Sequence, residues 1–456
     1  MNDFLSSQVD MIREVFHYQS RFEGSIMVFK IDFPVTQDPC FPSLVNDLAL
    51  LAKTGFKVII VPGAKEHIDT TLKIHNIESA FATNDIPVRI TTAKTISYVE
   101  MAAFNVAGKF MTFLSGSRVD AVIGNFVRAR GLGVINGTDT EHTGTVDKIY
   151  ADSLERVLNL GMVPILPCIG WSPSGKPYNV PSDEIALEVS SALGAAKLFI
   201  ISSGGGVKSL DLPQKKNSDP VEPEIRSDGS LIRLTPQQTE ALILANEGSA
   251  PNQQVLRELK LALKASRRGI HRVHLIDGRD EGVVLKELFS NLGVGTMIYT
   301  DEYDSIRPLR SGDLPDVLRL MEPLMQNGTL IRRNAEQIQE KKADYVVLVI
   351  DGSIRSCGAL HDWGESSGIV QGEIAAVATD SQYTDLGLGK KIVGYLIEKA
   401  IKRRMKRIFV LTTQSQDWFE AMGFKEATIE SLPEQKKLTY DQTRKSKIFT
   451  LEPDTF

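Results

Sequence analysis

A glycine-spaced loop is the part of this chain whose residue types point most directly to chemistry. It runs from Thr384 to Lys390 and reads Thr-Asp-Leu-Gly-Leu-Gly-Lys. The apolar run Ile374–Val377 precedes it, and a segment whose apolar residues recur every three or four positions follows it. Glycines let backbone N–H groups converge, and a helix N-terminus adds positive potential, so a strand, such a loop and a helix together bind anions. The pattern predicts an anion site here.

The elements in the first two thirds of the chain alternate between apolar strand candidates and helical candidates. This alternation over residues 20–300 predicts βαβ units and an α/β fold with a doubly wound, mainly parallel sheet. The strand candidates are Ser25–Phe29, Lys57–Val61, Met162–Leu166, Lys197–Ser202 and Arg272–Ile276. The helical candidates are Pro42–Lys53, Asp183–Leu193, Pro236–Glu247 and Asn252–Ser266.

A second, smaller domain is expected to begin near Ile306. A helix start at Ser311-Gly-Asp-Leu-Pro is followed by strand candidates on both sides of the glycine-spaced loop. These candidates are Tyr345–Ile350, Ser353–Ala359, the run containing Ile374–Val377, and Arg407–Thr413. The stretch 361–367, His-Asp-Trp-Gly-Glu-Ser-Ser, is predicted to be a turn, and we assign it no role.

The domain boundaries follow from this order. We expect a leading helix in residues 1–20, a first domain in residues 21–300 and a second domain in residues 301–456. The segment Ser7–Gln19 is amphipathic and precedes the first core, so it is expected to dock on a partner subunit.

Composition bounds the class of protein. A chain of 456 residues with 42% hydrophobic and 24% charged residues is typical of a soluble protein of two or three domains. The formal net charge of −5 argues against general nucleic-acid binding. No apolar run is long enough for a membrane span, and the N-terminus lacks a signal or transit pattern, so a cytoplasmic protein is expected. The 3 scattered cysteines and the lone close pair His271 and His274 predict neither disulfides nor a metal site.

The end of the chain resembles the acyl-CoA N-acetyltransferase superfamily, the GNAT fold. The resemblance rests on the glycine-spaced loop, the strand Arg407–Thr413 and the sequence from Trp418 to Phe424. In that superfamily the loop holds the pyrophosphate of coenzyme A, so acetyl-CoA is the expected co-substrate. Thr384 stands where the superfamily usually has Gln or Arg, so one phosphate contact is expected to be lost. The residues expected to contact the coenzyme are Ala376, Val377, Ala378, Leu386, Gly387, Leu388, Gly389 and Lys390.

The first part of the chain resembles the amino-acid kinase family, particularly acetylglutamate kinase. Lys30 and Asp183 stand where that family has its phosphate-contacting lysine and its catalytic aspartate. However, Ile-Asp-Phe-Pro follows Lys30, and the second glycine-rich loop has become Pro62-Gly-Ala-Lys65. Side chains at these positions narrow the backbone approach that a phosphate cradle requires, so kinase activity is not expected.

A later set of residues resembles the arginine-responsive members of the kinase family. It comprises His274-Leu-Ile-Asp-Gly278, Glu287-Leu-Phe-Ser290 and Gly293-Val-Gly-Thr296. A carboxylate pairs well with a guanidinium, and a lysine with an α-carboxylate. The alternative is an ordinary helix face whose apolar residues pack on the sheet while Glu287 stays solvated. The resemblance implies an arginine site at Lys197, His274, Glu287 and Gly293, with Phe16 or Tyr18 added from the leading helix.

The whole chain resembles the bacterial-type N-acetylglutamate synthases, in which both kinds of domain are joined. Further matched segments are Val88–Thr95, Leu330–Arg333, Gly372-Glu373, Leu432–Tyr440 and Arg444–Lys447. The resemblance implies acetyl transfer from acetyl-CoA to the α-amino group of L-glutamate, at the start of arginine biosynthesis. It also implies regulation by L-arginine, with feedback inhibition as the hypothesis, and a homo-oligomer, with a hexamer favoured.

Residue roles also come from this resemblance. The amine must lose a proton before it attacks the thioester, and Glu373 is the implied base. Thr412 is the implied proton donor to the leaving thiolate, while backbone N–H groups near Ala376–Ala378 polarise the carbonyl. The residues implied in glutamate binding are Leu330, Arg332, Leu411, Arg444 and Ser446, and the two arginines would each meet a carboxylate.

Two alternatives stay open. One is a bifunctional synthase–kinase, which the missing glycines oppose. The other is a non-catalytic arginine sensor with a vestigial acetyltransferase domain, which would release no thiol from acetyl-CoA with any amine.

Overall fold

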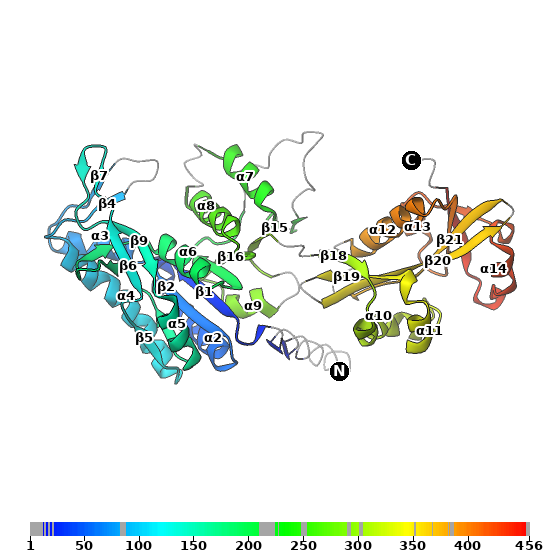
Figure 1. Ribbon diagram of the computed structural model, residues 1–456, viewed down its shortest axis with the longest axis horizontal. Coiled ribbons are helices and arrows are strands. Elements are labelled where there is room, and N and C mark those ends of the chain that lie inside the picture. Colours follow the sequence, from blue (N-terminus) through cyan, green and yellow to red (C-terminus); the bar gives the residue numbers. More distant parts are fainter. Residues whose placement is uncertain are drawn as a thin grey trace. The chain divides into compact units, whose positions relative to one another are not determined.

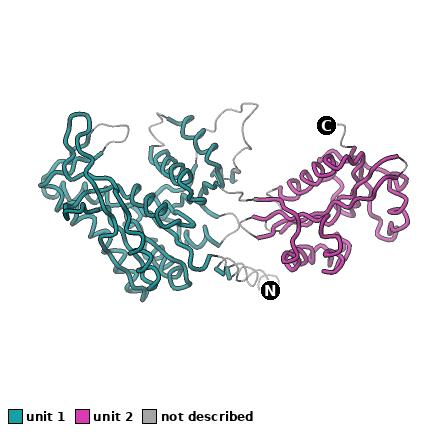
Figure 2. Tube along the Cα trace, in the orientation of Figure 1, with its two compact units in different colours: residues 1–301 teal, residues 302–456 magenta. Residues whose placement is uncertain are grey.

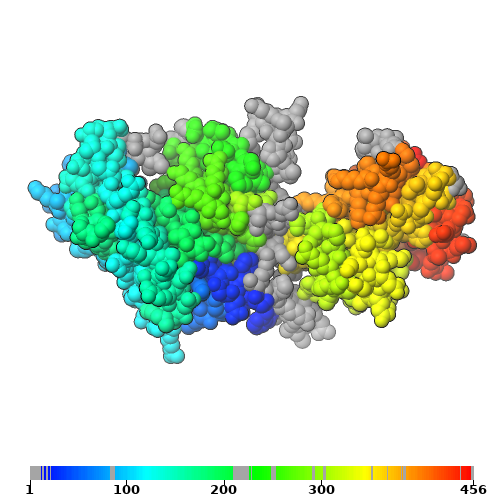
Figure 3. Space-filling model, viewed as in Figure 1, coloured from blue at the N-terminus to red at the C-terminus, as the bar shows by residue number. Residues whose placement is uncertain are grey.

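The computed structural model divides the chain into two compact units, Met1–Asp301 and Glu302–Phe456 (Figure 2). The residues it describes are 12, 15–16, 19–20, 22–82, 88–208, 224–226, 228–247, 253–289, 293–300, 304–350, 353–366, 368–381, 383 and 387–452 (Figure 3, where the others are grey). Among these residues, no helix combines the length and apolar character that crossing a membrane requires.

A nine-stranded, mainly parallel sheet forms the centre of the first unit (Figure 1). Its strand order is β14-β15-β17-β16-β13-β1-β2-β10-β5, and β17 runs antiparallel to β16. The central strands are mostly apolar because both faces of the sheet are covered. The strand bounds are β1 Ile26–Ile31, β2 Lys57–Pro62, β5 Ala121–Ile123, β10 Val163–Ile165, β13 Lys197–Ser202, β14 Glu224–Ile225, β15 Leu231–Leu234, β16 Arg272–Asp277 and β17 Thr296–Tyr299.

Helices cover both faces of this sheet. Alternate residues of β1 enter two different cores: Phe29 packs with α2 and α4 on one face, and Val28 packs with α6 and α8 on the other. This is the doubly wound arrangement that the alternating pattern predicts. The helix bounds are α2 Phe41–Lys53, α3 Lys65–Ile74, α4 Ile96–Gly116, α5 Ala151–Asn159, α6 Ser182–Ala192, α7 Pro236–Ala245, α8 Gln253–Arg267 and α9 Val283–Phe289.

Smaller sheets complete the first unit. One has four strands in the order β12-β11-β6-β9, and two are strand pairs, β3 with β4 and β7 with β8. Their bounds are β3 Ala80–Ala82, β4 Val88–Ile90, β6 Val127–Gly131, β7 Val134–Ile135, β8 Thr138–Asp139, β9 Gly144–Ile149, β11 Ile169–Trp171 and β12 Pro177–Asn179.

The second unit is a seven-stranded sheet in the order β18-β19-β20-β21-β22-β24-β23. Helix α12 packs on one face, and α10 and α11 pack on the other (Figure 1). The strand bounds are β18 Asp304–Pro308, β19 Tyr345–Ile350, β20 Ser353–Ser366, β21 Ile369–Thr379, β22 Arg407–Thr412, β23 Lys425–Ala427 and β24 Lys447–Leu451. The helix bounds are α10 Leu314–Gln326, α11 Ala335–Glu340, α12 Leu388–Lys402, α13 Gln416–Glu420 and α14 Glu434–Leu438.

One predicted element was wrong. The stretch 361–367 was expected to be a turn, but strand β20 continues through it as far as Ser366. The pairing of β20 with β21 shifts register between Asp362 and Glu365, and Gly364 has a φ of +69°. A bulge at a glycine therefore lets the strand pass through a polar segment, and it places Trp363 on the sheet.

Two adjacent glycines after β13 offer a test of how closely the strands approach. A Cβ added to Gly205 would lie 2.0 Å from the backbone carbonyl of Ile276, whereas one added to Gly204 meets nothing within 4 Å. Backbone cannot move aside as a flexible side chain can, so we expect Gly205→Ala to lower the free energy of unfolding of this unit by more than about 2 kcal/mol. Gly204→Ala, the matched control, is expected to change it by less than about 0.5 kcal/mol. Urea unfolding of both variants measures the difference, and equal stabilities would contradict the close approach.

Candidate functional site

The strands β21 and β22 stop pairing in the middle of the second unit. Their parallel ladder runs only from Gln371 opposite Arg407 to Glu373 opposite Phe409. On their other edges β22 pairs with β24, and β21 pairs with β20. In the described part of the chain, residues 374–379 of β21 therefore have no ladder to β22, which leaves this stretch of backbone available to a ligand.

A distortion at Ala376 marks the same stretch of β21. Ala376 is buried and has a φ of +56°, a conformation that costs a residue with a side chain about 1 kcal/mol or more. The register between β20 and β21 shifts beside it, between Cys357 and Ala359. The thiol of Cys357 donates to the Ala376 carbonyl over 3.6 Å, and burial raises the pKa of this thiol to about 12, so it stays protonated. The bulge re-aims the peptide groups near Ala376–Ala378.

Glu373 is the last residue of β21 that pairs with β22, and only 5% of it is exposed. The ammonium of Lys436 contacts both of its carboxylate oxygens, at 2.7 Å and 2.8 Å. The indole N–H of Trp363 donates to Oε2 over 3.0 Å, and the Lys436 ammonium lies 5.1 Å from the centre of the same indole ring. The carboxylate is thus held by three donor contacts from two residues.

The other predicted active-site residues lie on the ends of β22 and β24 and on the loop after α10. Thr412 is buried, and its hydroxyl accepts from the backbone N–H of Ser415 over 2.9 Å. Arg444 donates through Nη2 to the carbonyls of Gly328 and Thr329, at 2.7 Å and 2.9 Å. It therefore fixes the loop that leads to Leu330 and Arg332.

Residues around that loop complete the group. Arg332 is exposed, while Leu330 packs against the core under α10. Leu411 packs with Phe409 in a small core, and Ser446 is buried, its carbonyl accepting from the Tyr440 hydroxyl over 2.6 Å. The chain thus brings residues separated by more than a hundred positions to one end of the sheet.

The glycine-spaced loop leads into α12. Gly387 has a φ of +65° at the N-terminus of this helix, a conformation that favours glycine. A Cβ added to Gly389 would lie 3.4 Å from the Trp418 ring and 3.5 Å from the hydroxyl of Thr379, so this glycine fits between β21 and α13. Leu388 is buried and Lys390 is exposed. Thr384 and Leu386 lie outside the described residues.

In the first unit, a buried histidine and glutamate form a second candidate site. His274 on β16 donates through Nδ1 to Oε1 of Glu287 on α9 over 2.6 Å, and each residue is less than 10% exposed. The other oxygen of Glu287 accepts from the backbone N–H groups of Val294 and Gly295, at 2.6 Å and 2.8 Å. The Nε2 atom of His274 is buried and has no hydrogen-bond partner among the described residues.

The protonation states of this pair follow from their surroundings. Burial, together with the nearby charge of Lys197, lowers the pKa of His274 despite its hydrogen bond to Glu287. Burial would raise the pKa of Glu287, but the hydrogen bonds from His274, Gly295 and Val294 outweigh it and hold this pKa below its usual range. The site therefore offers a carboxylate and a neutral imidazole whose Nε2 can accept a hydrogen bond.

Gly293 and Arg226 line the same carboxylate. A Cβ added to Gly293, which has a φ of +61°, would lie 2.6 Å from Oε2 of Glu287. Arg226 donates to the carbonyls of Gly293 and Gly295, at 3.1 Å and 3.0 Å. Burial lowers the pKa of the Arg226 guanidinium, and its attraction to Glu287 opposes that effect. The guanidinium of Arg226 thus lies near the Glu287 carboxylate.

Lys197 stands on the neighbouring strand. It is buried on β13, next to β16, and its ammonium lies 5.3 Å from the ring of Phe22. Phe16 is 65% exposed, and Tyr18 lies outside the described residues. The structure brings Lys197, His274, Glu287 and Gly293 together, and Phe22, which follows the predicted leading helix (residues 1–20) in the chain, lies beside Lys197.

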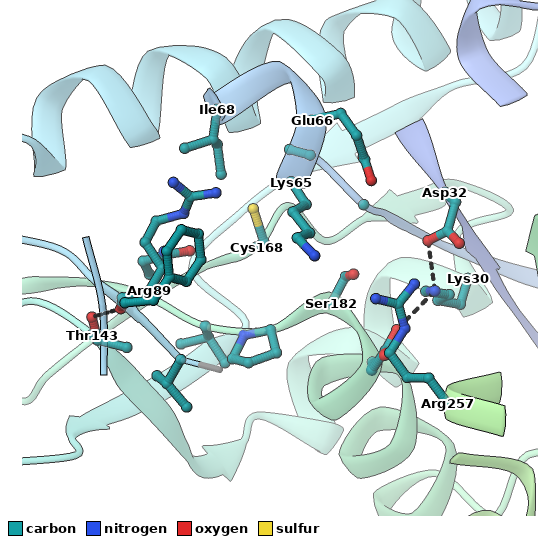
Figure 4. Close-up of a pocket in the computed structure, with 18 residues that line it drawn as sticks. Lys30, Asp32, Lys65, Glu66, Ile68, Arg89, Thr143, Cys168, Ser182 and Arg257 are labelled. Atoms are coloured by element: carbon teal, nitrogen blue, oxygen red, sulfur yellow. Dashed lines mark hydrogen bonds and ion pairs between the residues drawn. The ribbon is translucent and has the colours of Figure 1, made fainter. Parts of the chain in front are cut away.

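A third candidate site is the cavity where the kinase resemblance places a phosphate. It has a volume of about 230 Å³, and the N-termini of α3 and α6 line it (Figure 4). The ammonium of Lys30 contacts Asp32 at 2.6 Å and Asp183 at 2.7 Å. Burial lowers the pKa of Lys30, but these two carboxylates raise it above its ordinary value. The lysine charge is thus matched by two carboxylates.

Three functional candidates were not found from the sequence alone: Lys436, Trp363 and Arg226. Lys436 belongs to the matched run Leu432–Tyr440, and Trp363 to the stretch that received no role. Lys436 lies 63 residues from Glu373 along the chain, so the contact becomes visible only in the folded structure.

Comparisons with known proteins fall on both units. The model of the amino acid kinase family matches residues 34–228, and that of the acetyltransferase (GNAT) family matches residues 314–424. The amino-acid acetyltransferase of Escherichia coli (strain K12) is 31% identical over 451 residues, which are 96% of this chain and 97% of that one. The amino-acid acetyltransferase of Pectobacterium carotovorum subsp. carotovorum (strain PC1) is 31% identical and spans 99% of this chain and 100% of its own.

Solved structures match over the same length. The crystal structure of N-acetylglutamate synthase from Neisseria gonorrhoeae complexed with coenzyme A and L-arginine has a TM-score of 0.79 and 27% identity, over 97% of this chain and 99% of that one. The structure of the gonococcal synthase complexed with coenzyme A and N-acetyl-glutamate has a TM-score of 0.58 and 29% identity, with the same coverage.

The lowered pKa of His274 predicts a pH dependence of stability. The unfolded chain binds a proton at this residue below a pH of about 6.5, whereas the folded chain does not, so stability is present above that pH and is lost as the pH falls. We expect the free energy of unfolding to decrease between pH 7 and pH 5, and to decrease less in His274→Gln, which keeps a donor but does not titrate. Urea unfolding at several pH values measures both slopes, and identical slopes would contradict the assignment.

Proposed function

The chain belongs to the amino-acid acetyltransferase family, and we propose that it transfers the acetyl group of acetyl-CoA to the α-amino group of L-glutamate. The observation that carries this proposal is the buried carboxylate of Glu373 at the point where β21 and β22 stop pairing. The relatives support the substrates, because the gonococcal synthase is complexed with coenzyme A and with N-acetyl-glutamate, the product of such a transfer. We propose that this product enters arginine biosynthesis.

Direct transfer is the mechanism that we propose. Glu373 takes a proton from the α-ammonium, directly or through water, and the free amine attacks the thioester carbon. The N–C bond forms to give a tetrahedral intermediate, whose collapse breaks the C–S bond. The Thr412 hydroxyl gives a proton to the leaving thiolate and regains one from the attacking nitrogen, directly or through water. Backbone N–H groups of Ala376–Ala378, on the stretch of β21 with no ladder to β22, stabilise the oxyanion. The protonated thiol of Cys357 makes it unsuited to carry the acetyl group.

The coenzyme is proposed to lie along β21 and the start of α12. The amides of residues 386–390 would receive its pyrophosphate, because Gly387 and Gly389 let the backbone approach closely and the helix start adds positive potential. Lys390 is exposed beside them and adds a cation.

Glutamate is proposed to bind at the end of the sheet that carries Leu330, Leu411 and Ser446. Arg332 is exposed on its loop and offers a bidentate fork to one carboxylate. Arg444 holds the same loop by donating through Nη2 to two carbonyls. We propose that its Nε–H and Nη1–H groups donate to a second carboxylate.

Regulation by L-arginine is proposed for the first unit. A ligand guanidinium would pair with the carboxylate of Glu287, the buried Nε2 of His274 would accept one of its N–H groups, and Lys197 would meet the α-carboxylate. The gonococcal synthase complexed with L-arginine supports this ligand. We propose that residues 21–300 form this regulatory domain, that residues 301–456 form the catalytic one, and that arginine inhibits.

The leading segment is proposed to join subunits into a homo-oligomer, with a hexamer favoured. Ile12 is 54% exposed and Phe16 is 65% exposed, so two large apolar side chains face outward from the described part of this segment. A kinase activity is not proposed, because Lys30 is already paired with Asp32 and Asp183.

Loss of the base is the most direct mutational test of catalysis. We expect Glu373→Gln to lower kcat for glutamate by about 100-fold or more, because the amide cannot accept the proton. Coenzyme A binding, measured by calorimetry, is expected to stay within about twofold of wild type, since Glu373 contacts Lys436 and Trp363 and no described residue of the glycine-spaced loop. The matched control is Glu365→Gln, an exposed carboxylate on β20, which should leave kcat unchanged. Retained activity in Glu373→Gln would contradict its role, and absence of glutamate acetylation by the wild type would contradict the proposed function.

Arginine binding offers an independent test of the first unit. We expect Glu287→Gln to weaken L-arginine binding by about tenfold or more, because a charge-assisted hydrogen bond to the guanidinium is lost. Calorimetry measures the affinity, and the acetylation rate without arginine checks that the variant is folded. Glu281→Gln, at an exposed position just before α9, is the control and should bind arginine as the wild type does. Unchanged affinity in Glu287→Gln would remove this site.

A further inference from the structure

The proposed catalytic base is already bound by an internal ammonium. Lys436 contacts both oxygens of Glu373, and Trp363 donates to one of them. A carboxylate has about four lone-pair positions, and three donor contacts occupy most of them. A substrate α-ammonium that gives its proton directly to this carboxylate competes with Lys436 for that place.

Moving Lys436 away from Glu373 has an electrostatic cost. Only 13% of the lysine side chain and 7% of the glutamate side chain are exposed. A buried charge that loses its partner is strongly destabilised, which opposes any displacement that leaves the ammonium alone. Displacement is favourable only if the incoming molecule brings an anion for Lys436 as well as a cation for Glu373.

We propose that Lys436 is a specificity-determining residue that exchanges ion-pair partners when the acceptor binds. In the free enzyme its ammonium pairs with Glu373. In the complex, the α-ammonium of the acceptor takes the place on Glu373. Lys436 then joins one of the two arginines, Arg332 or Arg444, at the side-chain carboxylate of the acceptor. This inference rests on the proposed function and adds to it a reason why the acceptor must be an acidic amino acid.

The surroundings of Lys436 fit an exchange of this kind. The residue lies on α14, a helix of 5 residues between β23 and β24. Its neighbour Lys437 is half-buried and is paired with Glu434. Trp363 holds Oε2 of Glu373 through its indole N–H, so the carboxylate stays fixed while the ammonium moves. The same ring lies 5.1 Å from the ammonium, and its face can support the cation in either position.

Every amino acid brings an α-carboxylate, which one of Arg332 and Arg444 takes, so only an acidic acceptor has a second carboxylate left for Lys436. Before binding, one ion pair exists within the protein and the glutamate side chain is hydrated; after binding, two ion pairs exist. A neutral isostere such as L-glutamine supplies the ammonium but leaves Lys436 facing an amide. The site therefore rejects glutamine because it strands a buried cation, which is the kind of mismatch that gives large discrimination.

The test is the ratio of kcat/KM for L-glutamate to kcat/KM for L-glutamine, measured by thiol release from acetyl-CoA. We expect Lys436→Met to lower this ratio at least tenfold, through a higher KM for glutamate and no comparable loss with glutamine. Lys436→Arg keeps a cation and should retain most of the ratio. Lys437→Met is the matched control on the same helix and should leave the ratio as in wild type.

The outcomes separate this inference from the proposed function. If both substrates lose activity equally in Lys436→Met, the residue only supports the structure, and the exchange is overturned. If Lys436→Met fails to bind coenzyme A, Lys436→Gln replaces it, because its amide still donates to Glu373 but carries no charge; the same tenfold fall in the ratio is expected, and an unchanged ratio overturns the exchange. If wild type acetylates neither substrate, the proposed function fails first.

Discussion

A carboxylate that is taken out of water must be met by donors or cations, and this constraint organises both units. In the second unit, Glu373 is met by the ammonium of Lys436 and the indole of Trp363. In the first unit, Glu287 is met by His274 and two backbone N–H groups, with the guanidinium of Arg226 nearby. Each internal cation is of the same chemical kind as the ligand that we propose for its site: an ammonium for glutamate and a guanidinium for arginine.

The fold supplies the positions at which such carboxylates are useful. The end of the β21–β22 ladder places Glu373 beside backbone that has no strand partner on that side, and the positive φ of Ala376 re-aims the next peptide groups. The parallel pairing of β13 with β16 sets Lys197 near His274, while Gly293 leaves room for the Glu287 carboxylate. In the kinase-like cavity the same constraint leaves no charge to attract a phosphate at Lys30, because Asp32 and Asp183 balance the charge of its ammonium.

Local patterns were enough to predict most strands and helices, and the tertiary contacts were not. The strand Lys197–Ser202 and the strand Tyr345–Ile350 were predicted with the bounds that the structure has, since the first contains the apolar run Leu198–Ile201 and the second is apolar throughout. The extension of β20 through Trp363 was missed, because a bulge that tolerates polar residues depends on the partner strand. The contact of Lys436 with Glu373 joins residues far apart in sequence. The family resemblance therefore identified the segment Leu432–Tyr440 but assigned no role to Lys436. Thr384, Leu386 and Tyr18 remain predictions outside the described residues.

The central claim is that L-arginine bound to the first unit lowers the rate of acetyl transfer in the second. It requires an arginine site in the first unit, an active site in the second, and coupling between them. The most direct measurement is the rate of glutamate-dependent thiol release from acetyl-CoA as L-arginine is titrated, at substrate concentrations near KM. We predict that the rate falls and saturates at the arginine concentrations that saturate binding. A rate that stays constant while calorimetry shows arginine bound would contradict the claim.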